Sequence, residues 1–334
     1  MQIEEPYLLF LGDVQDRPHA KTAAGIAYWR PDAAKAQLRL PSCPVDLGLP
    51  EMTVAAAAAA GVRTIIVGVA PDGGELPRSW VEPLAEGLTL GLDIASGLHT
   101  RLAAIPALKE AAAKHGRKIH DVRFPVRASP IATGAKRAGK RLLTVGTDCA
   151  VGKMYTALAL EREMRTRGMN ADFRATGQTG ILICGSGVAV DAVVSDFVAG
   201  AAETLSPDAP HDHWDVVEGQ GSLFHPSYAG VSLGLLHGSQ PDFIVMCHDA
   251  ARPSIIGVHG YDLPGIAACI ETNLRMGRLT NPAIRCAGVS VNTSALSEGA
   301  ARAFLLRTAA ETGLPCVDPV RTGVAPLIDV LASP

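Results

Sequence analysis

Short apolar runs alternate with helical stretches along the first part of the chain. Residues 7–12 and 62–70 are apolar or β-branched on both faces, which is typical of buried parallel strands. Residues 53–60 are rich in alanine and end at Gly61, a pattern that predicts a helix and its C-terminal stop. Strands and helices that alternate in this way favour an open parallel sheet.

The alternation continues, is interrupted by a linker and then starts again. A helical stretch is expected at 21–26, a further unit at 80–86, a helix at 105–115 and a strand at 118–123. We therefore predict a Rossmann-like domain over residues 1–124, although no GxGxxG motif supports a bound dinucleotide there. Residues 125–140, with their prolines, glycines and basic residues, are interpreted as a linker. Residues 141–334 are predicted to form a second, P-loop NTPase-like α/β domain.

A glycine-rich loop stands between a strand and a helix at the start of the second domain. Residues 142–145 form a short apolar run, and residues 155–167 carry a helical pattern. Between them lies the loop Gly146-Thr147-Asp148-Cys149-Ala150-Val151-Gly152-Lys153-Met154. GxxxxGK spacing in this context is the signature of a P-loop, and we expect all nine residues to contribute to binding a cofactor.

The chemistry of the P-loop follows from its residue types. Glycines let the backbone approach a phosphate so that successive N–H groups point toward it, and the helix N-terminus adds partial positive charge. Lys153 adds a full charge. Met154 stands where related ATPases and GTPases have the Ser or Thr that holds Mg²⁺, and a thioether does not bind a hard cation. The sequence therefore predicts phosphate binding without a metal.

Polar residues follow the predicted strands of the second domain, at the edge where open α/β sheets bind ligands. The candidates for binding a substrate are Arg174, Thr176, Gln178, Thr179, Ser222 and Arg252. The candidate bases are Glu218 and His225, and His248 also stands at a strand end. A carboxylate facing a phosphate loop has little structural use, which favours Glu218. Structural roles for the arginines and the histidines stay open as alternatives.

Composition and charge narrow the class of protein. The chain has 334 residues and a net charge of −3, and its basic residues form no cluster of the kind that binds nucleic acid. No apolar run reaches the ~18 residues that span a bilayer, and the acidic start lacks a secretory pattern. The seven scattered cysteines show neither zinc nor disulfide spacing. We expect a cytoplasmic enzyme that acts on a small molecule, forms a homo-oligomer and engages neither nucleic acid nor membrane.

The P-loop domain resembles dethiobiotin synthetase and its relatives. The similarity lies in Gly146-Thr147-Asp148-x-x-Val151-Gly152-Lys153 and in Val217-Glu218-Gly219-x-Gly221. Asn292, at a predicted strand end, is similar to the asparagine with which those relatives recognise a base, so the resemblance implies that it binds the cofactor. Those enzymes use ATP and Mg²⁺ to phosphorylate a carbamate. An ATP-dependent kinase or ligase is therefore one alternative.

Nearly the whole chain resembles a two-domain family of D-glutamate N-acetyltransferases, long known only as proteins of unknown function. The similarity lies in residues 6–14, 20–25, 176–180 and 218–223. It implies that acetyl-CoA donates its acetyl group to the amine of D-glutamate. Coenzyme A carries phosphates, but acetyl transfer needs no Mg²⁺, which agrees with Met154. A nucleotide-binding sensor without turnover is a second alternative.

The resemblance leads to a hypothesis of direct acetyl transfer. The P-loop and Lys153 hold the phosphates of coenzyme A, while Arg174 and Arg252 pair with the carboxylates of the amino acid. Glu218 or His225 removes a proton from the ammonium group, and the freed amine attacks the thioester. Lys153 is counted with these two as a candidate catalytic residue.

Two further roles belong to the same hypothesis. Hydroxyl groups such as those of Thr147 and Ser222 stabilise the tetrahedral oxyanion. Cys149 is an alternative, covalent carrier of the acetyl group, because a position near a helix N-terminus is expected to lower the pKa of a thiol.

Overall fold

The computed structural model describes residues 2–69, 76–124 and 129–332, which divide into two compact units. The first unit contains the described residues up to 124 together with Gly177–Ala192, and the second contains residues 129–176 together with those from 193 onward. Each unit is an α/β structure built on a parallel sheet, which confirms the predicted fold class. The segment Gly177–Ala192 lies beyond the predicted domain boundary in sequence, yet it packs with the first unit.

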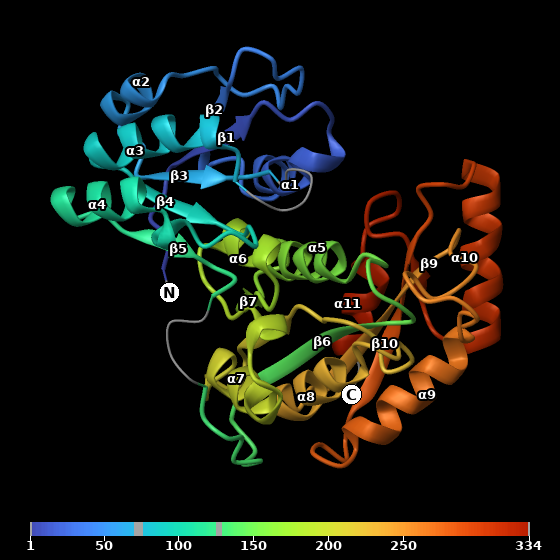
Figure 1. The fold of residues 1–334 in the computed structure, drawn as a ribbon. Coiled ribbons are helices and arrows are strands. Elements are labelled where there is room, and N and C mark those ends of the chain that lie inside the picture. The colour runs from blue at the N-terminus through green and yellow to red at the C-terminus, as the bar shows by residue number, and fades with distance from the viewer. Residues whose placement is uncertain (1, 70–75, 125–128, 333–334) are drawn as a thin grey trace. The chain divides into compact units, whose positions relative to one another are not determined.

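The sheet of the first unit has five parallel strands in the order β2-β1-β3-β4-β5. These are β1 (Tyr7–Gly12), β2 (Ala34–Arg39), β3 (Thr64–Val67), β4 (Asp93–Ser96) and β5 (Ile119–Asp121). The helices are α1 (Lys21–Trp29), α2 (Val54–Ala59), α3 (Val81–Thr89), α4 (Pro106–His115) and α6 (Gln178–Cys184). Helix α1 lies on one face of the sheet and α2, α3 and α4 lie on the other (Figure 1). The strands are therefore covered on both faces.

The sequence pattern locates most of these elements but not β2. Strand β1 is buried at every residue, as the two-sided apolar run at 7–12 predicts. The hydroxyl of Thr53 caps α2 by accepting a hydrogen bond from the backbone N–H of Ala56, and Gly61 follows the helix with a φ of 84°. Strand β2 is an edge strand, and its sequence AKAQLR alternates only weakly. Because an edge strand is half exposed, it lacks the continuous apolar run that marks β1.

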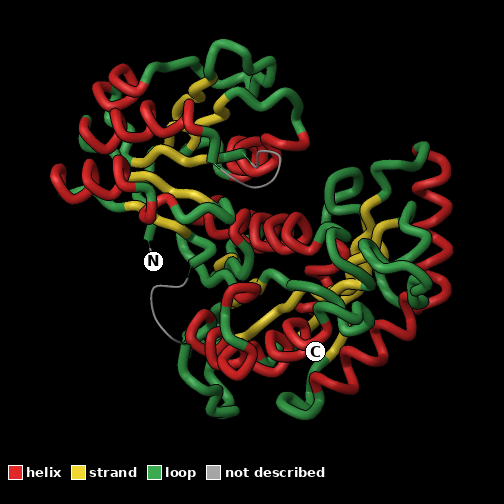
Figure 2. Tube along the Cα trace, viewed as in Figure 1, coloured by secondary structure: helices red, strands yellow, loops and turns green. Residues whose placement is uncertain are grey.

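The sheet of the second unit has six parallel strands in the order β11-β10-β9-β6-β8-β7. These are β6 (Lys140–Gly146), β7 (Ala171–Arg174), β8 (Trp214–Val217), β9 (Phe243–Asp249), β10 (Arg285–Asn292) and β11 (Cys316–Val317). The helices are α5 (Lys153–Thr166), α7 (Val198–Leu205), α8 (Ala229–Ser239), α9 (Ile266–Gly277), α10 (Glu298–Thr312) and α11 (Ala325–Ala332). Figure 2 shows these strands enclosed by helices.

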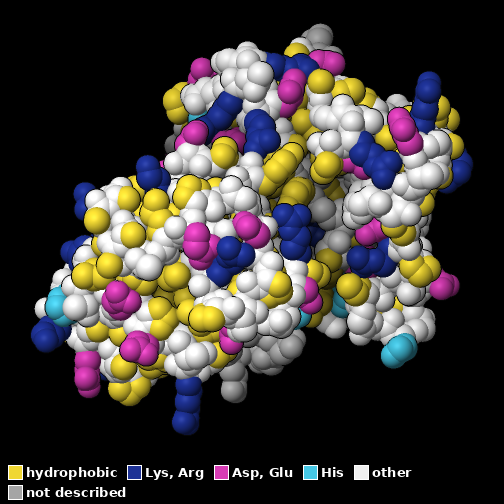
Figure 3. Space-filling model, turned by 90° about the horizontal axis from the view of Figure 1, so that it is seen from above, with side chains coloured by type: hydrophobic (Ala, Val, Ile, Leu, Met, Phe, Trp, Pro, Cys, Tyr) yellow, Lys and Arg dark blue, Asp and Glu magenta, His cyan; other side chains and the backbone are white. Residues whose placement is uncertain are grey.

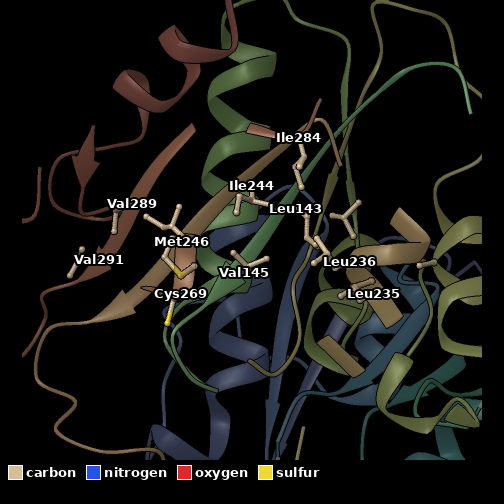
Figure 4. Close-up of a cluster of buried hydrophobic side chains, with 13 residues drawn as sticks. Leu143, Val145, Leu235, Leu236, Ile244, Met246, Cys269, Ile284, Val289 and Val291 are labelled. Carbon is tan, nitrogen blue, oxygen red and sulfur yellow. The ribbon is translucent and has the colours of Figure 1, made fainter. Parts of the chain in front are cut away.

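The hydrophobic core of the second unit fixes β6 at the centre of its sheet. On one face, Leu143 and Val145 of β6 pack with side chains from β9, β10, α8 and α9, as Figure 4 shows. The apolar side chains alternate along β6 with Thr144, which faces the other way. Strand β6 lies between β9 and β8, so the order of the strands reverses at β6. Ligands bind in open α/β sheets at such a reversal, and the P-loop follows β6 directly.

The outer surface carries mixed charges on the face seen in Figure 3. Lysine and arginine side chains are scattered there among acidic ones, without a continuous basic area. Among the helices of the described ranges, none combines the length and the apolar character needed to cross a membrane.

The packing of α8 against α7 leaves no room for a side chain at Gly238. A Cβ atom at Gly238 would lie 2.1 Å from the carbonyl oxygen of Ala199 in α7, whereas a Cβ atom at Gly230 in the same helix would meet nothing within 4 Å. We expect Gly238→Ala to lower the free energy of unfolding by about 1–3 kcal/mol through overpacking.

The matched variant Gly230→Ala is expected to raise the same free energy, by up to about 1 kcal/mol, because alanine loses less backbone entropy in a helix. Denaturation of both variants by urea measures the difference. Equal effects of the two substitutions would contradict the close approach of α7 and α8.

A candidate anion-binding site at the P-loop

The P-loop turns sharply between β6 and α5 and leaves backbone N–H groups free. Strand β6 ends at Gly146 and α5 begins at Lys153, so the motif lies between a strand and a helix as predicted. Ala150 and Gly152 have positive φ angles of 54° and 95°. Within the described residues, the N–H groups of Ala150, Val151 and Gly152 donate to no acceptor. Free N–H groups at the start of a helix form a binding site for an anion.

Lys153 is a buried cation that lacks a carboxylate partner. Its side chain is 7% exposed, and its Nζ donates a hydrogen bond of 2.8 Å to the carbonyl oxygen of Asp148. In the parts of the chain that the structure describes, no acidic side chain forms an ion pair with it. Burial lowers the pKa of Lys153 below its ordinary value of 10.5. A buried ammonium group without a counterion is unfavourable by itself and favours the binding of an anion.

Asp148 and Arg252 hold the P-loop from behind. A guanidinium N–H of Arg252 donates to the carboxylate of Asp148 at 2.8 Å and also to the carbonyl oxygen of Cys149 at 3.2 Å. The backbone N–H of Ile256 donates to the same carboxylate oxygen at 2.8 Å. The guanidinium of Arg252 thereby bonds to the P-loop itself. We interpret it as a residue that braces the loop, rather than as the predicted partner of a substrate carboxylate.

Glu218 reaches the site from the end of β8, the strand next to β6. It follows β8, is buried, and accepts a hydrogen bond of 2.8 Å at Oε2 from the backbone N–H of Thr176. The hydroxyl of Thr176 donates to the carbonyl oxygen of Glu218 at 2.7 Å. Glu218 also favours the charged form of Lys153, although burial opposes that form more strongly. The predicted proximity of Glu218 to the P-loop is thus seen in the structure.

Gly219 makes this approach of β8 to β6 feasible. Its N–H donates a hydrogen bond of 2.9 Å to the hydroxyl of Thr144 in β6. A Cβ atom at Gly219 would lie only 1.6 Å from the carbonyl oxygen of Thr144 and 3.1 Å from Cδ of Lys153. The Glu-Gly pair therefore lets a carboxylate stand beside the P-loop lysine, because the second residue has no side chain.

Ser222 and His225 lie near the P-loop but are engaged by other groups. The hydroxyl of Ser222 donates to the carbonyl oxygen of Thr147 at 3.0 Å. Nδ1 of His225 accepts from the backbone N–H of Ser227, and Nε2 lies 3.1 Å from the carbonyl oxygen of Ile256, to which it donates. Both ring nitrogens of His225 are thus satisfied in the neutral form. The geometry favours Glu218 over His225 as the base.

A second histidine contacts the P-loop from β9. Nδ1 of His248 lies 3.1 Å from the hydroxyl of Thr147, and its ring stacks on Phe304. Burial lowers the pKa of His248, so the ring is neutral at pH 7. His248 thereby orients the Thr147 hydroxyl. Sequence reasoning placed it at a strand end but gave no signal for this contact.

The expectation of an activated thiol at Cys149 is wrong. Burial raises the pKa of Cys149 above its ordinary value, and this effect exceeds the lowering by Lys153. Ligand atoms of Asp148, Cys149 and His225 lie within 4.8 Å of one another. The carboxylate of Asp148 is already bonded to Arg252, however, which disfavours a further cation there. Thr156 offers no replacement for the missing metal-binding hydroxyl, because its Oγ1 is bonded to Ser290 at 2.8 Å.

A cavity of about 300 Å³ adjoins the P-loop on the side of β10 and β11. It is lined by Ala150, Val151, Gly152, Tyr155, Thr156, Asn292, Ser294, Asp318, Pro319, Val320 and Arg321. Asn292 lies at the end of β10, as predicted. Its Oδ1 accepts from the N–H of Ser294 and its Nδ2 donates to Asp249 at 3.3 Å, which leaves one donor and one acceptor for a ligand. The residues from 318 to 321 were not identified from the sequence, because β11 has only two residues.

Of three further predicted substrate-binding residues, Arg174 belongs to the second unit, and Gln178 and Thr179 belong to the first. Nε of Arg174 donates to the buried carboxylate of Asp215 at 2.6 Å. Asp215 stands at the start of β8, at the end of the sheet opposite the P-loop, so the Arg174 side chain turns away from the site. Gln178 and Thr179 begin α6 in the first unit, where the Thr179 hydroxyl lies 3.2 Å from that of Thr22.

The lowered pKa of Lys153 predicts that replacing this buried cation does not destabilise the protein at pH 7. Because its pKa is lowered in the folded protein, the charged form favours the unfolded chain. We expect Lys153→Met to be at least as stable as the wild type at pH 7. The wild type should gain stability relative to this variant as the pH rises from the lowered pKa toward 10.5.

Inorganic pyrophosphate supplies the missing counterion in the same experiment. It should raise the melting temperature of the wild type and of an exposed control, Lys109→Met, but not that of Lys153→Met. Scanning calorimetry across pH measures all three proteins. A normal pyrophosphate response in Lys153→Met would contradict an anion site at this lysine.

Substituting Arg252 is expected to weaken anion binding, whereas substituting Arg174 is expected to destabilise the fold. Arg252→Gln removes the brace of the P-loop, so its affinity for pyrophosphate should fall about tenfold or more. Arg174→Gln leaves the buried Asp215 with fewer partners, so it should lower the free energy of unfolding by about 1–3 kcal/mol and leave that affinity unchanged. Titration calorimetry and urea denaturation measure the two effects, and the opposite assignment would overturn this interpretation.

Family models match the chain in two adjoining parts. The Rossmann-like domain of a domain of unknown function, DUF1611_N, matches residues 39–125. The P-loop domain of the same family, DUF1611_C, matches residues 130–328. Both parts carry the folds seen in the structure.

Known proteins match the chain over nearly its whole length. The D-glutamate N-acetyltransferase of Tritonibacter scottomollicae is 51% identical over 331 residues, which cover 99% of each chain. The D-glutamate N-acetyltransferase of a Pseudoalteromonas species is 47% identical over 328 residues, which cover 98% of this chain and 99% of the relative. The crystal structure of a DUF1611 family protein from Anabaena variabilis has a TM-score of 0.84 and 32% identity and covers 98% of this chain and 99% of that one. The chain therefore belongs to the DUF1611 family of two-domain P-loop proteins, whose curated members include these D-glutamate N-acetyltransferases.

Proposed function

We propose that this protein transfers the acetyl group of acetyl-CoA to the amine of D-glutamate. The two D-glutamate N-acetyltransferases match it at about half of all positions over nearly the full chain, which supports the same reaction. The observation that carries the choice of donor is the buried, uncompensated Lys153 next to free N–H groups. Such a site favours an anionic carrier, and coenzyme A has a pyrophosphate group.

The residues around the P-loop fit coenzyme A in two places. The N–H groups of Ala150, Val151 and Gly152, with Lys153, match a pyrophosphate. Asn292 retains one donor and one acceptor, the pair with which an asparagine amide reads the N6 and N7 atoms of adenine. The cavity of about 300 Å³ connects these places and has the size of a small-molecule site.

The residues that distinguish this site from an ATPase site are Met154 and Arg252. Met154 cannot hold Mg²⁺, and Thr156 is occupied by Ser290. Arg252 is paired with Asp148 and braces the loop, so the shape of the loop does not depend on a bound metal. Acetyl transfer forms no new phosphate bond, so a fixed cradle of this kind is sufficient to hold the carrier.

Glu218 is the residue that we assign to proton removal. An amine attacks a thioester only as the free base, so the ammonium of D-glutamate has to lose a proton first. Oε2 of Glu218 is held by the N–H of Thr176, which fixes the position of the carboxylate, and Glu218 acts on Lys153 electrostatically. The bound thioester supplies the electrophilic carbonyl. Thr147, oriented by His248, is the hydroxyl that we assign to the developing oxyanion.

A metal-free assay tests the proposed reaction. Protein, D-glutamate and acetyl-CoA are mixed in the presence of a chelator, and free thiol is followed together with N-acetyl-D-glutamate by mass spectrometry. We expect both products to appear in equal amounts. A parallel mixture with ATP and Mg²⁺ in place of acetyl-CoA should yield no ADP. Formation of ADP without thiol release would replace this proposal with the kinase or ligase alternative.

Replacing Glu218 tests its assignment within the same assay. Glu218→Gln retains an oxygen that can accept from Thr176 but does not take up a proton, so kcat should fall by about 10²–10⁴-fold. The affinity for coenzyme A, measured by calorimetry, should stay unchanged. Glu271→Gln, on the exposed side of α9, is a matched control that should behave as the wild type. An unchanged kcat in Glu218→Gln would remove Glu218 as the base.

A further inference from the structure

A single cationic side chain lines the cavity beside the P-loop. Of the residues that line the cavity, Arg321 alone is positively charged and Asp318 alone is negatively charged. Both belong to the turn that follows β11, and they line the same cavity as Gly152 of the P-loop. The function proposed above uses the P-loop and Asn292 but leaves Arg321 without a role.

The carboxylate of Asp318 holds this turn together through hydrogen bonds. Its Oδ2 accepts from the N–H and the hydroxyl of Thr293. Its Oδ1 accepts from the N–H groups of Val320, at 2.8 Å, and Arg321, at 3.0 Å. With both oxygens occupied by donors, the carboxylate fixes the backbone at Arg321, and its negative charge is turned toward these donors. The turn therefore presents Arg321 to the cavity from a rigid base.

Within the described residues, the guanidinium of Arg321 is anchored at a single nitrogen. NH2 donates to the carbonyl oxygen of Leu296 at 2.8 Å. Among the described residues, no carboxylate forms an ion pair with Arg321. The exposed side chain thus keeps further N–H donors for a ligand, and guanidinium groups match the oxygens of a phosphate.

The positions of these groups along the cavity suggest which phosphate is recognised. The P-loop residues, where a pyrophosphate fits, line this cavity, and Asn292 lines it from the end of β10. The ribose that joins base and pyrophosphate has to lie between them. In coenzyme A that ribose carries a 3′-phosphate, which ATP lacks.

We propose that Arg321 binds the 3′-phosphate of coenzyme A and so selects this carrier over nucleotides without that group. The proposal rests on the acetyl-CoA-dependent function proposed above. Arg321 is then a specificity-determining residue that takes no part in proton transfer. Val320 and Pro319, which line the same part of the cavity, supply apolar surface beside it.

Binding of coenzyme A and of 3′-dephospho-coenzyme A to the wild-type protein tests this directly. The two ligands differ only in the phosphate, so titration calorimetry measures its contribution without any mutation. We expect coenzyme A to bind about 10- to 100-fold more tightly, as charge-assisted hydrogen bonds to one phosphate would give. Equal affinities would overturn the proposal.

The variant Arg321→Gln shows whether this residue is responsible. It should bind both ligands with the weaker affinity of dephospho-coenzyme A, while Arg302→Gln, an exposed arginine of α10, should keep the wild-type preference. Unchanged melting temperatures show that both variants are folded. A preference for coenzyme A that survives in Arg321→Gln would contradict the assignment.

The outcomes also separate this inference from the function on which it rests. If the wild type binds coenzyme A and acetylates D-glutamate but does not distinguish dephospho-coenzyme A, only the role of Arg321 falls. If it binds ATP and neither form of coenzyme A, the proposed function falls together with this inference.

Discussion

A buried ammonium group that forms no ion pair within the described residues is the constraint around which the second unit is organised. Lys153 is held by one carbonyl oxygen, that of Asp148, and its pKa is lowered because burial opposes its charge. Folding therefore places a group where it is less stable than in water. Such an arrangement persists when other contacts over-determine it, and an arriving anion relieves it. We expect the charge that destabilises the free protein to stabilise a complex with an anion.

The contacts that over-determine Lys153 come from three strands. Strand β6 leads into the P-loop, and β8 approaches it so closely that Gly219 has no space for a side chain. Strand β9 supplies His248, and the segment after it supplies Arg252, which binds Asp148 behind the loop. Because all three strands are parallel and adjacent, their carboxyl ends meet at one edge of the sheet. The chemistry of the site is thus a consequence of strand order.

The sequence predicted where the P-loop and the strand ends of this site lie, but it did not predict the contacts that their side chains make. The GxxxxGK motif and the apolar runs locate the P-loop, Glu218 and Asn292 at strand ends, since these features depend on local pattern. The directions of Arg174 and Arg252 depend on partners 41 and 104 positions away in the sequence, namely Asp215 and Asp148. No local pattern encodes such pairings. The same reason explains why the return of Gly177–Ala192 to the first unit was missed.

The pairing of Asp148 with Arg252 explains how a P-loop can serve acyl transfer. In phosphoryl transfer, charge develops on the phosphate itself, and a mobile divalent cation neutralises it. In acyl transfer the phosphates only anchor the carrier, and charge develops on a distant thioester carbonyl. A guanidinium bonded to Asp148 and to the carbonyl oxygens of Cys149 and Ala150 instead holds the loop in a constant conformation for anchoring. In the proposed reaction Met154 is tolerated, because no step of acetyl transfer requires a hydroxyl at that position.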